Sequence, residues 1–173
     1  NQTFELRKTC LMTIDGGQLR NALGHFATGV CVVTAATETG PIGLTINSFA
    51  SVSLNPPLVL WSLDRASDRA EAFHIAERFA INVLPEELKD LATSLAKKGA
   101  HAIPEGMLEN EPHGIPVISG ALARFVCKVE QRYDGGDHVI FVGLVEEFTH
   151  VHEGRPLLFH RGAFRSLADL KEA

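Results

Sequence analysis

The sequence predicts a mainly β protein whose strands form a closed or nearly closed barrel with flanking helices. Three observations support this fold class. Short apolar, β-branched runs recur along the chain, turn residues separate them at hairpin spacing, and segments with a helical period are few. The 173 residues suffice for one domain. We expect it over 15–168, between an N-terminal extension (1–14) and a C-terminal tail (169–173).

A helix and a hairpin open the predicted domain. Residues 15–26 carry apolar side chains at helical spacing. The residues on that face are Leu19, Leu23 and Phe26. VCVVTAA (30–36) and IGLTIN (42–47) have strand patterns, and ETGP (38–41) between them has turn chemistry. PLVLWSL (57–63) is typical of a further buried strand.

Two more helices and a strand follow. Residues 67–77 have a helical pattern, with Ser67 placed as the N-cap. FAINVL (79–84) returns to a strand pattern. Pro85 then opens another helix, with two glutamates near the positive end of its dipole. Lys97-Lys98-Gly99 marks the expected end of that helix.

The second half predicts a loop and then paired strands. Residues 99–116 hold several prolines and glycines and no clear period, which indicates a loop or lid. Long strands are expected over 121–133 and 138–149, on either side of the hairpin signal DGGD (134–137). The short strands expected after them are PLLFH (156–160) and AFRSL (163–167).

Composition argues against several classes of protein. The net charge is -5 and the basic residues are scattered, so we expect neither nucleic acid nor an anionic membrane surface as a partner. No apolar run reaches the roughly 18 residues of a spanning helix, and residues 1–20 do not resemble a signal peptide. The three cysteines are not closely paired, which predicts a reducing, cytoplasmic location.

Several motifs with known chemistry are missing from the sequence. It has no phosphate-binding P-loop, no G-x-G-x-x-G, no C-x-x-C and no G-x-S-x-G. His150 and His152 share one face of a strand, but a metal would need a third ligand such as Glu153. We therefore expect two solvent-facing histidines and no metal site.

Five sequence blocks together resemble one family. They are LRNALGHFATGVCVVTA (19–35), GLTINSFASVSLNPPLVLWSL (43–63), RFAINVL (78–84), GGDHVIFVGLVEEF (135–148) and RPLLFHRGAFRSL (155–167). In this order and spacing they resemble the flavin reductases that supply reduced flavin to two-component monooxygenases. The resemblance implies an FMN-binding split β-barrel, usually a homodimer.

The block 43–63 contains no charged residue, and the resemblance implies that its first residues hold the isoalloxazine ring. That ring is a flat apolar plate with a hydrogen-bonding rim, so its pocket needs apolar walls and neutral polar groups, whereas buried charges would be costly. On the residues alone, the same side chains could equally satisfy the backbone of a bulged strand. The residues assigned to the ring are Gly43, Leu44, Thr45, Asn47 and Ser48.

The ribityl and phosphate end is predicted along 62–73, where a strand ends and a helix begins. Free backbone N–H groups and the positive end of the helix dipole would favour an anion there. The residues assigned to this end are Ser62, Leu63, Asp64, Ser67 and Arg69, with Ser94 from the next helix. In the alternative interpretation, Arg69 is an exposed arginine paired with Asp68 or Glu71.

His138 directly follows the DGGD turn, and the resemblance places it beside the nicotinamide as the catalytic residue. Arg161 is assigned by the same resemblance to a cofactor phosphate or the flavin. The relatives often carry tyrosine where this chain has His160 and Phe164, which bears on ring stacking.

The function implied is that of an NAD(P)H:flavin oxidoreductase, which passes hydride from NADH, or alternatively NADPH, to FMN or FAD. The reduced flavin would then reach a partner oxygenase. Hydride transfer needs little beyond stacked rings with reacting atoms about 3 to 3.5 Å apart, which agrees with the lack of an acid–base pair. Two alternatives stay open: a flavin-binding barrel without nicotinamide chemistry, and an oxidoreductase with tightly bound flavin acting on a small organic substrate.

Overall fold

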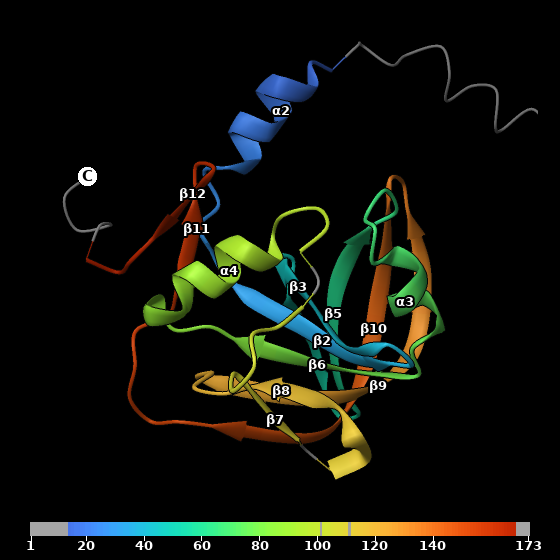
Figure 1. Ribbon diagram of the computed structural model, residues 1–173. Helices are drawn as coiled ribbons and strands as arrows, with labels where there is room; N and C mark the ends of the chain where they lie inside the picture. Colours follow the sequence, from blue (N-terminus) through green and yellow to red (C-terminus); the bar gives the residue numbers. More distant parts are fainter. Residues whose placement is uncertain (1–13, 101, 111, 169–173) are drawn as a thin grey trace, which may run out of the picture.

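A curved antiparallel sheet dominates the computed structural model, which describes residues 14–100, 102–110 and 112–168. Its strands are β2 (Cys31–Thr37), β3 (Gly40–Ile46), β4 (Ala50–Leu54), β5 (Pro57–Asp64), β6 (Arg78–Val83), β9 (Ala123–Gly135) and β10 (His138–His150). They lie in the order β3-β2-β6-β9-β10-β5-β4 and curve around an apolar core (Figure 1). The predicted mainly β class with flanking helices is confirmed.

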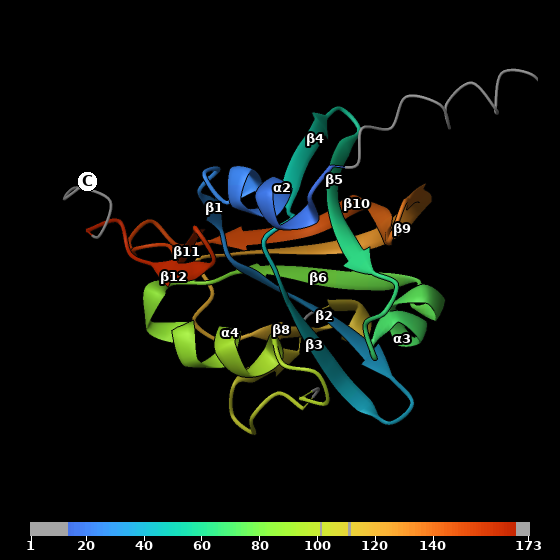
Figure 2. The same cartoon turned by 90° about the horizontal axis from the view of Figure 1, so that it is seen from above.

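Smaller elements surround this sheet. The remaining strands are β1 (Thr28–Gly29), β7 (Leu108–Asn110), β8 (Pro116–Ile118), β11 (Leu158–His160) and β12 (Ala163–Arg165). The helices are α2 (Gly16–Leu23), α3 (Ala70–Ile75) and α4 (Lys89–Leu95), with 3-10 turns at Glu86–Leu88 and Pro112–Gly114. Figures 1 and 2 show α3 and α4 on opposite sides of the barrel. In the described part of the chain, no helix has the length and apolar character needed to cross a bilayer.

Strand β5 shows how alternation positions the site. Trp61 and Leu63 point into the core and are at most 1% exposed, so Ser62 and Asp64 face the opposite side. The Trp61 ring stacks on Phe141 with centroids 4.7 Å apart and meets the edge of Phe73 at 5.2 Å. This cluster fixes the strand whose other face lines the cavity described below.

A second core lies beneath α4. Leu91 and Leu95 pack there with Val32, Leu84 and Ile118, all of them buried. This packing holds α4 against the inner strands of the sheet, so the chain that leaves the helix at Ala96 starts from a fixed point.

The buried side chain of Asn82 on β6 links two neighbouring segments to its strand. Its Nδ2 donates to Val32 O on β2 at 2.9 Å, and its Oδ1 accepts from Ile118 N on β8 at 2.8 Å. Because both ends of the amide are satisfied, the group can be buried without a large penalty.

Gly143 in β10 is a position where only glycine fits. It follows a shift in register between β9 and β10, and a Cβ there would lie 2.6 Å from Phe79 Cζ and 2.9 Å from Cys127 Cβ. Since both neighbours are buried, we expect Gly143→Ala to lower the free energy of unfolding by about 1–3 kcal/mol. Urea denaturation followed by circular dichroism measures the change.

Gly29→Ala serves as the control for that substitution, because nothing lies within 4 Å of a Cβ at Gly29. We expect a change of less than about 0.5 kcal/mol there. Equal losses in the two variants would show that the close approach to Phe79 is not the cause.

All three predicted helices are shorter than expected. The helix predicted from Pro85 begins as a 3-10 turn over Glu86–Leu88 and is α-helical only over Lys89–Leu95. The helix predicted over 15–26 spans Gly16–Leu23, where Asp15 caps it by accepting from Gln18 N at 2.9 Å. The helix predicted over 67–77 spans Ala70–Ile75. Ser67 is not its N-cap, because the residues before Ala70 form a separate turn, which closes from Ser67 N to Asp64 O at 3.0 Å.

The segment predicted as a loop over 99–116 contains strand β7 and the start of β8, which pair with each other. Each strand has three residues, too few to show a period. Most of the other predicted strands are confirmed with small changes at their ends, including the β9–β10 hairpin around Gly136 and Asp137.

Candidate functional site

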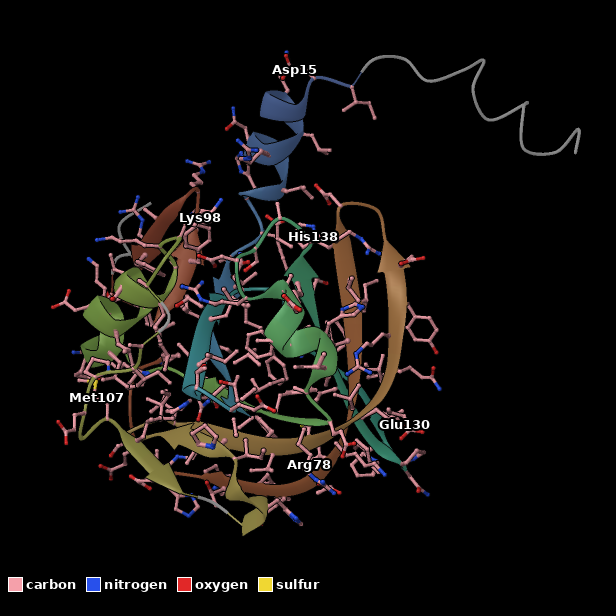
Figure 3. The ribbon with its side chains drawn as sticks, turned by 45° about the vertical axis from the view of Figure 1, so that its right-hand side comes forward. Asp15, Arg78, Lys98, Met107, Glu130 and His138 are labelled. Atoms are coloured by element: carbon pink, nitrogen blue, oxygen red, sulfur yellow. The ribbon has the colours of Figure 1, made fainter. Side chains whose placement is uncertain are left out.

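A cavity of about 350 Å³ opens at one end of the barrel. Four segments surround it: the end of β3, the end of β5 with the loop after it, the chain that follows α4, and the first residue of β10. The lining residues are Leu44, Thr45, Ile46, Asn47, Ser48, Ser62, Asp64, Ala66, Ser67, Asp68, Arg69, Ala96, Lys98 and His138. Figure 3 shows Lys98 and His138 at this end, Lys98 on the α4 side and His138 on the β10 side.

The structure brings most of the predicted cofactor residues together in this cavity. The sequence predictions found along its lining are Leu44, Thr45, Asn47, Ser48, Ser62, Asp64, Ser67, Arg69 and His138. They come from segments far apart in the chain, and the pairing of β5 with β10, which sets Asp64 opposite His138, brings two of these segments to one place.

Four predicted residues lie outside the lining of this cavity. Leu63 points into the core at 1% exposure, as alternation along β5 requires. Gly43 faces α4 instead, where a Cβ would lie 3.0 Å from Leu95 Cδ1. Ser94 is exposed on α4. Arg161 lines a separate cavity and places its Nη2 3.3 Å from His25 Nδ1.

The neutral polar side chains at the end of β3 divide into two kinds. Thr45 Oγ1 donates to Ala92 O at 2.8 Å, and Ser48 Oγ both donates to Ser62 O (3.2 Å) and accepts from Ser62 N (2.9 Å). These hydroxyls satisfy backbone groups, as in the alternative interpretation of this stretch. Within the described residues, the Asn47 amide and the Ser62 hydroxyl make no hydrogen bond, so both can serve a ligand.

The turn after β5 uses its own backbone donors. Ala66 N donates to Asp64 Oδ1 at 2.8 Å, Arg69 N to Ser67 Oγ at 3.3 Å, and Ala70 N to Ser67 O at 3.0 Å. The six-residue helix α3 then begins without a side-chain cap. The amides of Ala66, Arg69 and Ala70 therefore already have acceptors within the turn and are not free for an anion.

Arg69 is buried at 3% exposure, so its interpretation as an exposed arginine was wrong. Its Nη2 donates to Lys97 O at 2.8 Å and also to Ala100 O. Asp68 lies 4.0 Å from its Nε. Burial lowers the pKa of Arg69, and the nearby Asp68 carboxylate opposes that shift. Arg69 thus ties the chain after α4 to the turn after β5.

His138 stands at the mouth of the cavity, with 42% of its side chain exposed. Its Nδ1 lies 2.7 Å from Asp137 Oδ1, and this hydrogen bond holds the pKa of Asp137 below its usual range. Arg65 clamps the turn that carries both residues, because its backbone N donates to Asp137 O at 3.0 Å and its Nε to Gly136 O at 3.2 Å. The ring therefore sits on a fixed support.

An apolar cavity of about 160 Å³ adjoins the first and shares Thr45, Ile46, Asn47 and Ala96 with it. Its far wall is formed by Phe159 and Phe164, whose rings meet edge to face with centroids 5.7 Å apart. Together the two cavities offer an apolar slot beside a polar, charged end. A planar ring joined to an anionic group fits this division.

Sequence reasoning missed some of the lining. Ile46, Ala66 and Ala96 carry no chemical signal that could have marked them. The sequence marked Lys98 only as part of a helix end, although a cation at that position could also bind an anionic ligand. No group of three metal-ligating side chains occurs among the residues that the structure describes, and the His150 and His152 rings lie 5.2 Å apart.

Comparison with known proteins agrees with this geometry. Residues 23–168 match the model of the flavin reductase like domain, so the chain belongs to that family. It is 49% identical over 155 residues to the NADH-dependent FMN reductase SmoA of Agrobacterium fabrum, covering 87% of this chain and 88% of that protein. It is 36% identical over 156 residues to HsaB of Mycobacterium tuberculosis, the reductase subunit of a flavin-dependent monooxygenase, covering 89% of this chain and 83% of HsaB.

Solved structures show the same fold. The NADH:FAD oxidoreductase SgcE6 of Streptomyces globisporus, in complex with NAD and FAD fragments, matches with a TM-score of 0.82 and 36% identity, over 87% of this chain and 92% of that one. The flavin reductase PheA2 matches with a TM-score of 0.80 and 37% identity, over 89% and 99% of the two chains. These neighbours confirm the predicted split-barrel class.

Proposed function

We propose that the protein is an NADH:flavin oxidoreductase that reduces FMN or FAD and supplies the reduced flavin to a partner monooxygenase. One observation carries the proposal. In a chain of the flavin reductase family, a cavity combines an uncharged slot at the end of β3 with a half-exposed histidine at the start of β10. The relatives named as NADH-dependent FMN reductase and as monooxygenase reductase subunit support both halves of it.

The residues of the chain have separate tasks in this proposal. When bound, the flavin supplies the hydride acceptor, its N5 atom. Leu44 and Ile46 form an apolar wall for its ring, and the free Asn47 amide serves the hydrogen-bonding rim. His138 lies beside the nicotinamide and holds it in place. Because the cavity is open on one side, both rings can enter and leave.

Steady-state oxidation of NADH, followed by its absorbance with and without added FMN or FAD, tests this function. We expect turnover that requires free flavin and saturates with it. NADH oxidation that does not depend on added flavin, or no oxidation at all, would contradict the proposal. Parallel assays with NADPH measure the cofactor preference.

The same preparation separates the two alternatives. A flavin-binding protein without nicotinamide chemistry would bind FMN but leave NADH unconsumed. An oxidoreductase with tightly held flavin would stay yellow through dilution and gel filtration. We expect instead a protein that loses its flavin on gel filtration and regains activity when flavin is added back.

We also propose that the protein is a homodimer in the cytoplasm. The α2 helix has no buried residue, its Leu19 and Leu23 are 46% and 65% exposed, and Phe26 shortly after the helix is 78% exposed. An apolar helix face of this kind is typical of a surface that another chain covers. Light scattering should give twice the monomer mass, and Leu23→Glu should shift the protein toward monomer. A monomer in the unchanged protein would contradict the proposal.

A further inference from the structure

The charged end of the 350 Å³ cavity combines acidic and basic side chains. Asp64, Asp68, Arg69 and Lys98 line this end. The backbone amides of Ala66, Ser67, Arg69 and Ala70 already have acceptors within the turn, so these four are not available to an anion. Two carboxylates at the same end would repel an anion. A cationic side chain at the cavity would offset this repulsion and favour a phosphate.

Arg69 already has another task. Its Nη2 contacts two backbone carbonyls of the chain after α4, those of Lys97 and Ala100, and the residue is 3% exposed. A guanidinium held in this way stabilises the shape of the cavity wall, and turning it toward a ligand would leave both carbonyls without that donor.

Lys98 lies in the segment after α4 that Arg69 and Asp68 hold by hydrogen bonds to its backbone. Arg69 binds the carbonyls on either side of it, and Gly99 N donates to Asp68 Oδ2 at 2.6 Å. The backbone is thus fixed before and after Lys98 while its side chain lines the cavity. Among the described residues, the Lys98 ammonium makes no hydrogen bond and no ion pair.

We propose that Lys98 binds the phosphate attached to the ribityl chain of the flavin nucleotide, which is the terminal phosphate of FMN, and that Asp68 and Arg69 position Lys98 by holding its neighbours. This inference rests on the proposed function. The two cations balance the two carboxylates at this end of the cavity. Removing Lys98 leaves one excess negative charge facing the phosphate, so its effect should fall on phosphorylated flavins alone.

Riboflavin provides the decisive comparison, since it has the ring and ribityl chain of FMN without the phosphate. Dissociation constants for both flavins can be measured by the quenching of flavin fluorescence in the Lys98→Gln protein. We expect FMN to bind about tenfold more weakly than in the unchanged protein, the size of a charge-assisted hydrogen bond at a partly exposed site. Riboflavin should bind within about twofold of its original affinity.

Two variants serve as controls. Lys97→Gln removes the same charge one residue earlier, at a side chain that does not line the cavity, and should leave FMN binding nearly unchanged. Lys98→Arg keeps the charge and should retain most of the FMN affinity. Added salt should weaken FMN binding to the unchanged protein more than to Lys98→Gln.

Three outcomes would overturn the proposal. Lys98→Gln could weaken both flavins equally, Lys97→Gln could cost as much as Lys98→Gln, or Lys98→Gln could raise the KM for NADH while FMN binding is unchanged. Failure of the proposed function is a different result, because the unchanged protein would then bind no flavin or oxidise no NADH.

Discussion

His138→Ala is expected to lower kcat/KM for NADH about 100-fold, because in the proposed function this side chain holds the nicotinamide in a productive position. The imidazole stands at the mouth of the cavity and is 42% exposed, so it is accessible to a second ring. It is oriented by Asp137 at 2.7 Å, on a turn that Arg65 clamps. Stopped-flow mixing with NADH under anaerobic conditions measures the rate of flavin reduction directly.

The effect should be confined to the nicotinamide step. FMN affinity should stay within about threefold in His138→Ala, since a solvent-facing imidazole adds little to flavin binding on its own. His150→Ala removes an exposed histidine at the far end of the same strand and should leave the rate unchanged. A loss of less than about threefold in His138→Ala would show that this ring does not hold the nicotinamide.

Trp61→Ala is expected to be the most damaging change to stability, lowering the free energy of unfolding by about 3–5 kcal/mol. Trp61 is fully buried and contacts the rings of Phe73, Phe79 and Phe141. Its indole Nε1 is buried without a hydrogen-bond partner among the described residues, so its removal returns part of a desolvation penalty. We expect the lost packing to outweigh that return. Calorimetry measures the shift in Tm.

Trp61→Phe keeps the test informative if the alanine variant does not fold. The smaller ring should cost about 1–2 kcal/mol, while FMN affinity stays nearly unchanged because Trp61 points away from the cavity. Val52→Ala is the matched surface control, since Val52 is 49% exposed. A destabilisation in Trp61→Phe no larger than in Val52→Ala would contradict the role assigned to this cluster.

The sequence predicted the strands better than the helices. In β5 and β10 the alternation of buried and exposed residues is set by the pleat itself, so a local pattern is enough to find them. The limits of α3 depend on the hydrogen bonds of Ser67 and on the burial of Arg69, which is fixed by carbonyls about 30 residues away in the chain. Such distant partners leave no local pattern.

In the candidate site, too, a local sequence pattern identifies some residues and only the structure identifies others. Thr45, Asn47 and Ser48 could be selected from an uncharged stretch, but only the structure separates the hydroxyls that satisfy backbone groups from the free Asn47 amide. Lys98 could not be assigned, because its place in the cavity depends on contacts of Asp68 and Arg69 with the residues on either side of it.

The position of FMN in a crystal of the protein soaked with that flavin tests the central claim most directly. The account predicts electron density for the ring against Leu44, Ile46 and Asn47, with His138 facing the space above the ring. Density for the flavin at another surface, with the end of β3 remote from it, would contradict the account.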